Sequence, residues 1–239
     1  GPRESVQQPQ WSPRGNLYFV SDRTGWWNLY IWRNGRVDPV SPAQAEMGGP
    51  PWVFGMSTYA FENEERIVCA VNRDGLWALE QIDTLTRRRS TLTSHWTQIQ
   101  DVRAMAGRAW LLAGSPSEPM SVVEMDARTN QFQVIQRSSG LRVEESALSM
   151  PRSLEYPTEG GAESHALFYS PKNGAFEGPP GERPPLVVMI HGGPTASARS
   201  SFSAEIQFFT SRGFAVLDVN YGGSTGFGRQ YRERLHGAW

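Results

Sequence analysis

The chain has 239 residues, enough for one large domain or two of ordinary size, and its 23 basic and 24 acidic residues leave a formal net charge of −1. This balance excludes the strong positive field of nucleic-acid-binding and membrane-surface proteins, so we expect neither nucleic acid nor a membrane as a partner. The single cysteine, Cys69, excludes an internal disulfide, and no apolar run reaches the roughly 18 residues of a membrane span. A single cysteine favours a reducing compartment, so we expect a cytoplasmic protein. No His, Cys, Asp or Glu cluster has metal-ligand spacing, and we expect no cofactor.

Residues 1–145 are rich in short β-type runs separated by Gly, Asn, Asp and Pro. Similar apolar strands are expected at 16–20, 66–70 and 108–112, and each is followed by a second strand, at 27–31, 75–79 and 120–124. A third, more polar strand follows at 35–40 and 130–135. Leu29, Leu76 and Val122 recur with a period in the mid-forties, which is typical of β-propeller blades. A β-sandwich with regular strand spacing is the alternative.

The predicted propeller is incomplete. Closure takes about 4–8 blades, and about three are visible. An open arc leaves strand edges unpaired, which invites aggregation. We therefore expect residues 1–145 to be the C-terminal blades of a longer, partial β-propeller.

The pattern changes near residue 146. A strand is expected at 164–169, followed by a surface loop rich in Pro and Gly, and then by a continuously apolar strand at 186–190 that should be covered on both faces. A helix at 202–212 ends at Gly213, and a strand follows at 214–220, so the two strands should be parallel. Residues 229–235 are expected to begin a further helix. Residues 146–239 are thus predicted to be the N-terminal portion of an α/β domain.

The strand at 186–190 ends in His191-Gly192-Gly193-Pro194. In many α/β-hydrolases such a loop forms half of an oxyanion hole, because glycines let the backbone N–H groups face the substrate. Gly193 and Gly192 are the candidate donors, and His191 and Pro194 are candidate supports of the loop. A plain strand-to-loop turn is the alternative, since Gly-Gly-Pro ends strands in many folds.

Three segments together resemble the prolyl oligopeptidase family of serine peptidases, particularly its acylaminoacyl-peptidase and dipeptidyl-aminopeptidase branch. The first is Gln8-Pro9-Gln10-Trp11-Ser12-Pro13 with the strand 17–23, the second is the His191–Pro194 loop, and the third is Asn220–Gly228. In the third segment, relatives usually carry Arg at the place of Gly222. The resemblance implies a propeller followed by an α/β-hydrolase domain, with the active site in the cavity between them. It also implies hydrolysis of short peptides through an acyl-enzyme.

A formal Gly-x-Ser-x-Gly nucleophile motif spans 222–226, with Ser224 at its centre. The nucleophile elbow normally follows the second strand beyond the oxyanion loop, whereas Ser224 follows the first. Only one histidine, His236, comes after it. The family has its own serine in this loop that is not the nucleophile. We therefore expect the catalytic Ser, Asp and His to lie beyond Trp239 and the chain to be inactive alone. The remainder of the hydrolase domain, or a second copy, should cover its open edges.

Relatives in this branch often carry acidic residues near a blade edge that bind a substrate's amino terminus, and Glu4 is the candidate here; a solvated surface carboxylate is the alternative. His191 stands where the prolyl-specific branch carries a tyrosine that serves the oxyanion. Two further functions remain open: an ester or amide hydrolase on the same fold, and a propeller-based binding module with a vestigial hydrolase domain.

Overall fold

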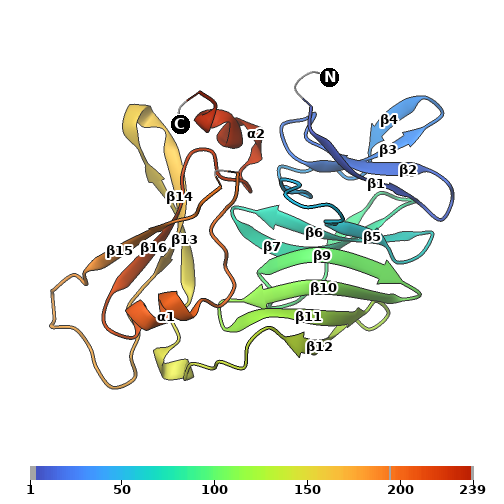
Figure 1. Ribbon diagram of the computed structural model, residues 1–239. Coiled ribbons are helices and arrows are strands. Elements are labelled where there is room, and N and C mark those ends of the chain that lie inside the picture. The colour runs from blue at the N-terminus through green and yellow to red at the C-terminus, as the bar shows by residue number, and fades with distance from the viewer. Residues whose placement is uncertain (1–3, 194, 238–239) are drawn as a thin grey trace.

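The computed structural model describes residues 4–193 and 195–237, which form four four-stranded sheets. Three antiparallel sheets follow one another along the chain and stack against each other; the fourth lies beside them with the helices (Figure 1). Within the described residues, no helix has both the length and the apolar character needed to cross a membrane.

Each of the first three sheets is a meander, in which strands adjacent in the chain pair with one another. The first contains Val6–Trp11 (β1), Leu17–Ser21 (β2), Asn28–Arg33 (β3) and Arg36–Pro39 (β4). The second contains Tyr59–Phe61 (β5), Arg66–Arg73 (β6), Leu76–Asp83 (β7) and Arg89–Thr91 (β8). The third contains Gln98–Met105 (β9), Arg108–Ser115 (β10), Glu118–Asp126 (β11) and Gln131–Arg137 (β12). The predicted strands of the first half are confirmed, to within a few residues at their ends.

Three of the hairpins turn through two residues that both have positive φ, a type I′ geometry whose twist matches that of the flanking strands. Glycine is the second of these residues in each case, because it adopts positive φ without a steric penalty. The pairs are Asn34-Gly35, Asp74-Gly75 and Ala106-Gly107.

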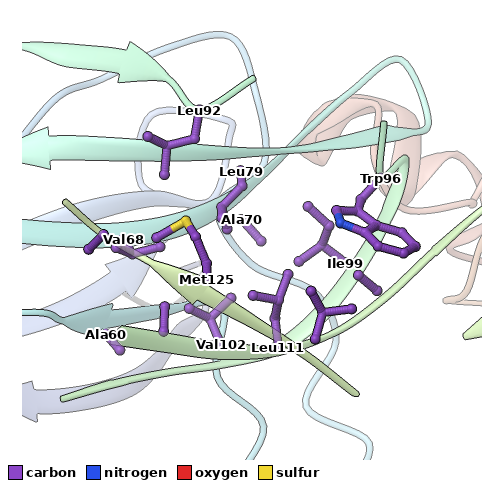
Figure 2. Close-up of a cluster of buried hydrophobic side chains, with 14 residues drawn as sticks. Ala60, Val68, Ala70, Leu79, Leu92, Trp96, Ile99, Val102, Leu111 and Met125 are labelled. Atoms are coloured by element: carbon purple, nitrogen blue, oxygen red, sulfur yellow. The ribbon is translucent and has the colours of Figure 1, made fainter. Parts of the chain in front are cut away.

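Apolar side chains fill the space between successive sheets. Figure 2 shows the cluster between the second and third sheets, where Val68 and Leu79 meet Leu111 and Met125. A second cluster lies between the first and second sheets and includes Cys69, whose burial raises the pKa of its thiol to about 12. Cys69 is thus a buried, neutral core residue.

The fourth sheet is mixed and has the strand order β13-β14-β16-β15. Its strands are Pro151–Pro157 (β13), Glu163–Tyr169 (β14), Leu186–Ile190 (β15) and Ala215–Asn220 (β16). β15 and β16 are parallel, as predicted, and the helix between them, Ala204–Thr210 (α1), packs Ile206 against Leu167 and Val216 on one face. A short helix, Gly228–Arg232 (α2), and a 3₁₀ turn, Glu233–Leu235 (η3), follow β16.

The prediction that the strand at 186–190 is covered on both faces is wrong for the residues described. Leu186, Val188 and Ile190 are 51%, 53% and 67% exposed, whereas the alternate residues Val187 and Met189 pack against the apolar cluster that contains Ile206 of α1. β15 is also the last strand of its sheet. An unbroken apolar run predicts burial on both faces, but here only the α1 side of the strand is covered.

A buried group of charges joins the end of the chain to the first sheet. Arg229 and Arg232 of α2 both bind the carboxylate of Asp22, which directly follows β2, at 2.9 Å and 2.7 Å. The Arg232 guanidinium also lies 3.8 Å from the centre of the Trp27 ring. Because Asp22 is buried, this shared carboxylate holds α2 in a defined position against the first sheet.

Glu46 adds a second carboxylate to this group. It accepts hydrogen bonds from the backbone N–H of Trp27 (2.6 Å) and of Gly228 (3.1 Å), and it lies 3.7 Å from Arg232. Burial raises the pKa of Glu46, while these donors favour its charged form. Through Glu46, the backbone of α2 is linked to the first sheet, as its two arginine side chains are through Asp22.

We predict that Asp22→Asn lowers the free energy of unfolding by about 3 kcal/mol, because it leaves two partly buried guanidinium groups without their shared carboxylate. Urea unfolding followed by circular dichroism measures this change. Glu64→Gln is the matched control: it removes an exposed ion pair with Arg14, which is worth about 1 kcal/mol or less. Equal small losses in the two variants would contradict a structural role for Asp22.

Candidate active site

The loop after β15 lies where the carboxyl ends of two parallel strands meet. β15 leads into His191–Gly193, and β16 leads into the loop 221–227. The two loops are hydrogen-bonded to each other, from the Thr225 N–H to the Ala196 carbonyl at 2.8 Å. This edge of a parallel sheet is where ligands bind in open α/β folds.

Gly193 has a backbone conformation that other residues rarely adopt. Its φ is +146°, and an added Cβ would lie 3.0 Å from the Thr195 nitrogen and 3.2 Å from the Ala196 Cβ. Gly193 is exposed, and within the described part of the chain its N–H donates no hydrogen bond. An exposed, unused N–H in the loop after a parallel strand is free to bind a developing oxyanion.

Gly192 differs from Gly193 in what surrounds it. An added Cβ at Gly192 would meet no atom within 4 Å, so its neighbours do not require glycine there. Of the two predicted donors, the geometry favours Gly193. Pro194, the predicted support of the loop, lies outside the described residues.

His191 makes a hydrogen bond that the sequence analysis did not anticipate. Its Nε2 lies 2.7 Å from the Ser224 hydroxyl, and its Nδ1 lies 2.9 Å from the Gly192 carbonyl oxygen. Because that oxygen can only accept, we place the ring proton on Nδ1, so Nε2 accepts from Ser224. The imidazole also stacks on Tyr221, whose hydroxyl donates to the His191 carbonyl. His191 is thus positioned to brace the 191–193 loop against the 221–227 loop.

Ser224 has a histidine partner but lies where a substrate cannot reach it. The residue is 0% exposed, and its N–H donates to the Tyr221 carbonyl within a tight turn. The flanking Gly223 has a φ of +116° and packs against Leu235, at 2.8 Å for an added Cβ. His236 is exposed at the end of η3. This burial agrees with the expectation that Ser224 is not the nucleophile of the Gly-x-Ser-x-Gly motif.

Glu4 is held by neighbours on the first sheet. Its carboxylate accepts hydrogen bonds from the Ser21 hydroxyl (2.6 Å) and the Arg23 guanidinium (2.7 Å), which lower its pKa to about 2. Glu4 is therefore an anion at neutral pH, but a substrate's amino terminus would have to share it with Arg23. Its binding role stays a prediction.

The other histidines lie in ordinary β-region packing. His165 of β14 stacks on Phe227 with ring centres 4.1 Å apart, and burial lowers its pKa. His95 lies 3.2 Å from Glu118. The described residues hold no group of three or more His, Cys, Asp or Glu side chains that could bind a metal ion.

Comparison with known sequences identifies relatives along much of the chain. The sequence pattern of the prolyl oligopeptidase family matches residues 200–239. A dipeptidyl aminopeptidase BIII of Pseudoxanthomonas mexicana is 31% identical over 128 residues, which cover 54% of this chain and 14% of that protein. An acylamino-acid-releasing enzyme 1 of Oryza sativa subsp. japonica is 30% identical over 123 residues, covering 52% of this chain and 13% of that protein.

Comparison with solved structures extends the similarity to nearly the whole chain. A puromycin-hydrolyzing peptidase of Mycobacterium tuberculosis matches with a TM-score of 0.94 and 35% identity. The match covers 98% of this chain and 37% of the solved one. The chain thus spans little more than a third of that structure, and far less of the two sequence relatives.

We predict that Ser224 takes no fluorophosphonate, a reagent that labels activated serines, because its hydroxyl is buried, although it is hydrogen-bonded to His191. Mass spectrometry of the treated 239-residue chain measures the label, with a known serine hydrolase in the same tube to show that the reagent is active. A Ser224-linked adduct that disappears in Ser224→Ala would contradict the prediction and make Ser224 a nucleophile.

Proposed function

Since the chain belongs to the prolyl oligopeptidase family, we propose that it is part of a serine peptidase that hydrolyses short peptides through an acyl-enzyme. The observation that carries the proposal is the exposed Gly193 N–H at the carboxyl end of β15. A peptide carbonyl placed there would have its negative charge stabilised in the transition state. The serine, aspartate and histidine of the triad would be supplied by chain beyond Trp239.

The domain assignment forms part of the same proposal. Residues 1–145 would be three consecutive blades of a propeller, which is supported by three stacked four-stranded meanders. Residues 146–239 would be the first portion of the α/β-hydrolase domain, which is supported by the parallel β15–α1–β16 unit. The exposed residues Leu186, Val188 and Ile190 would be covered by the remainder of that domain, or by a second copy.

Each predicted site residue has a role in this proposal. Gly193 is the main oxyanion donor and Gly192 the secondary one, while His191 and Pro194 keep the loop in place. His191 acts as a positioning residue, since its ring is occupied by Ser224, Tyr221 and the Gly192 carbonyl. Glu4 would bind the amino terminus of a peptide substrate. No step in this scheme requires a cofactor.

We predict that Gly193→Ala lowers kcat of the complete peptidase by roughly 10²-fold, the effect of losing one oxyanion donor. Alanine is strained at a φ of +146°, and its Cβ would lie 3.0 Å from the Thr195 nitrogen, so we expect the backbone to shift and the N–H to turn away from the substrate. Hydrolysis of a panel of aminoacyl p-nitroanilides, acetylated peptides and puromycin measures the change and the substrate class together.

The matched control is Gly140→Ala, because Gly140 is exposed and an added Cβ there meets no atom within 4 Å. Its rates should equal those of the wild type. A Gly193→Ala variant within twofold of wild type would remove the oxyanion role of this loop. A complete protein that hydrolyses none of the panel would favour the binding-module alternative.

A further inference from the structure

A small pocket of about 210 Å³ opens between the first and second sheets, beside three of their turns. Three arginines line it: Arg14 from the turn between β1 and β2, Arg33 at the end of β3, and Arg87 from the turn between β7 and β8. Glu64 is the one carboxylate that the described part of the chain contributes to the wall. Positive charge is therefore in excess in this pocket, although the whole chain has a formal net charge of −1.

The three turns lie at the end of the first two sheets that is farther from the fourth sheet (Figure 1). Asn16, which lines the pocket, precedes β2, whereas Asp22, which binds α2, follows it. The five residues of β2 separate these two ends by roughly 16 Å, at about 3.3 Å for each strand residue. The pocket therefore uses none of the residues that have a role in the proposed function.

Contacts between the two sheets hold two of the arginines at the pocket. The Arg87 guanidinium donates to the Pro39 carbonyl of β4 at 3.0 Å. Arg14 forms an ion pair with Glu64, in the turn between β5 and β6, at 3.4 Å. Each contact joins a residue of one sheet to a residue of the other, so the opposite walls of the pocket are fixed to each other.

Arg33 differs from the other two arginines in its surroundings. Among the described residues, its side chain makes no ion pair and no hydrogen bond. The residue opposite Arg33 in the register of β3 and β4 is Arg36, another cation. Like charges on directly opposite residues destabilise a pair of strands, so an anion bound beside Arg33 would offset this repulsion.

The Tyr18 hydroxyl adds a neutral donor to the same pocket. The Tyr18 ring is buried and packs edge-on against Phe61, with ring centres 4.9 Å apart, so the hydroxyl has a fixed position. Burial raises the pKa of Tyr18, while the positive charges of the three arginines act in the opposite direction. The three guanidinium groups thus act on one hydroxyl that keeps its proton at neutral pH.

We propose that this pocket binds a small phosphate-bearing anion, either inorganic phosphate or a phosphomonoester. Guanidinium groups pair with phosphate through charge-assisted hydrogen bonds, and a phosphate has more oxygens to share among three of them than a carboxylate has. The pocket is smaller than the roughly 300–1,000 Å³ of sites for drug-sized ligands, so it suits an ion or a small head group. Because Arg33 belongs to the first sheet and Arg87 to the second, the bound anion would link the two sheets.

The test measures the binding of inorganic phosphate to the complete protein by isothermal titration calorimetry at low ionic strength, since salt screens exposed charges. We expect Arg33→Ala to weaken binding about tenfold, the effect of losing one charge-assisted contact, and Tyr18→Phe to weaken it about threefold. Glu64→Gln should strengthen binding, because it removes the carboxylate that competes for Arg14.

Arg88→Ala is the matched control, because it removes the same charge from the residue next to Arg87, and Arg88 does not line the pocket. Its phosphate affinity should equal that of the wild type. Circular dichroism checks that each variant is folded. Phosphate should also raise the Tm of the wild type and of Arg88→Ala more than that of Arg33→Ala, because a ligand that binds the folded state stabilises it.

Glycerol 3-phosphate, titrated in place of inorganic phosphate, separates the two sources of the anion. Tighter binding of the ester identifies a phosphomonoester ligand, and weaker binding identifies the free ion. An affinity for acetate equal to that for phosphate would overturn the inference, since a carboxylate would then serve as well. Absence of binding, or an equal loss in Arg33→Ala and Arg88→Ala, would also overturn it. None of these results depends on peptide hydrolysis, so the proposed function stands or fails separately.

Discussion

The carboxylate of Asp22, shared by Arg229 and Arg232, is the contact on which the position of the candidate active site depends. The loop 221–227 lies between β16 and α2, so fixing α2 on the first sheet fixes that loop at its far end. The same loop contains Ser224, which holds His191. A chain of direct contacts therefore runs from the first sheet to the backbone of the candidate oxyanion loop. Because the charged groups in these contacts are buried, they resist displacement: a displaced charge would lose its partner without gaining full hydration.

At the candidate site, steric limits and hydrogen bonding act on different residues. Gly193 is set by its own backbone, whose φ of +146° is one that residues with a side chain rarely adopt. His191 is set by its partners, since both ring nitrogens and one ring face are occupied. The backbone conformation of Gly193 leaves its N–H free. The hydrogen bonds and ring contact of His191 keep its imidazole away from that N–H. Within three residues, a backbone N–H without a hydrogen-bond partner among the described residues thus follows a side chain held by several contacts.

The regular elements were predictable because their signals are local. Period-two alternation, two-residue turns such as Asp74-Gly75 and the helix stop at Gly213 each depend on neighbouring residues, and the structure places strands and α1 accordingly. The sequence did not predict the first strand of each meander, because β1, β5 and β9 are short or contain polar residues. The contacts His191–Ser224 and Asp22–Arg229 were missed because they join distant residues whose types have many possible partners. The open face of β15 was missed because an apolar run does not reveal which neighbours are present.

The separation of Asp22 from Arg229, 207 residues in the chain, has a consequence for the order of folding during synthesis. The meander sheets are built from hairpins between neighbouring strands, so they can form as soon as each has left the ribosome. Asp22, however, cannot bind Arg229 until α2 has been translated, and by then the three meander sheets can already have formed. Docking of α2 onto the first sheet thus closes a very long loop, and mutations at either end of it should act on a step that follows the formation of the three meander sheets.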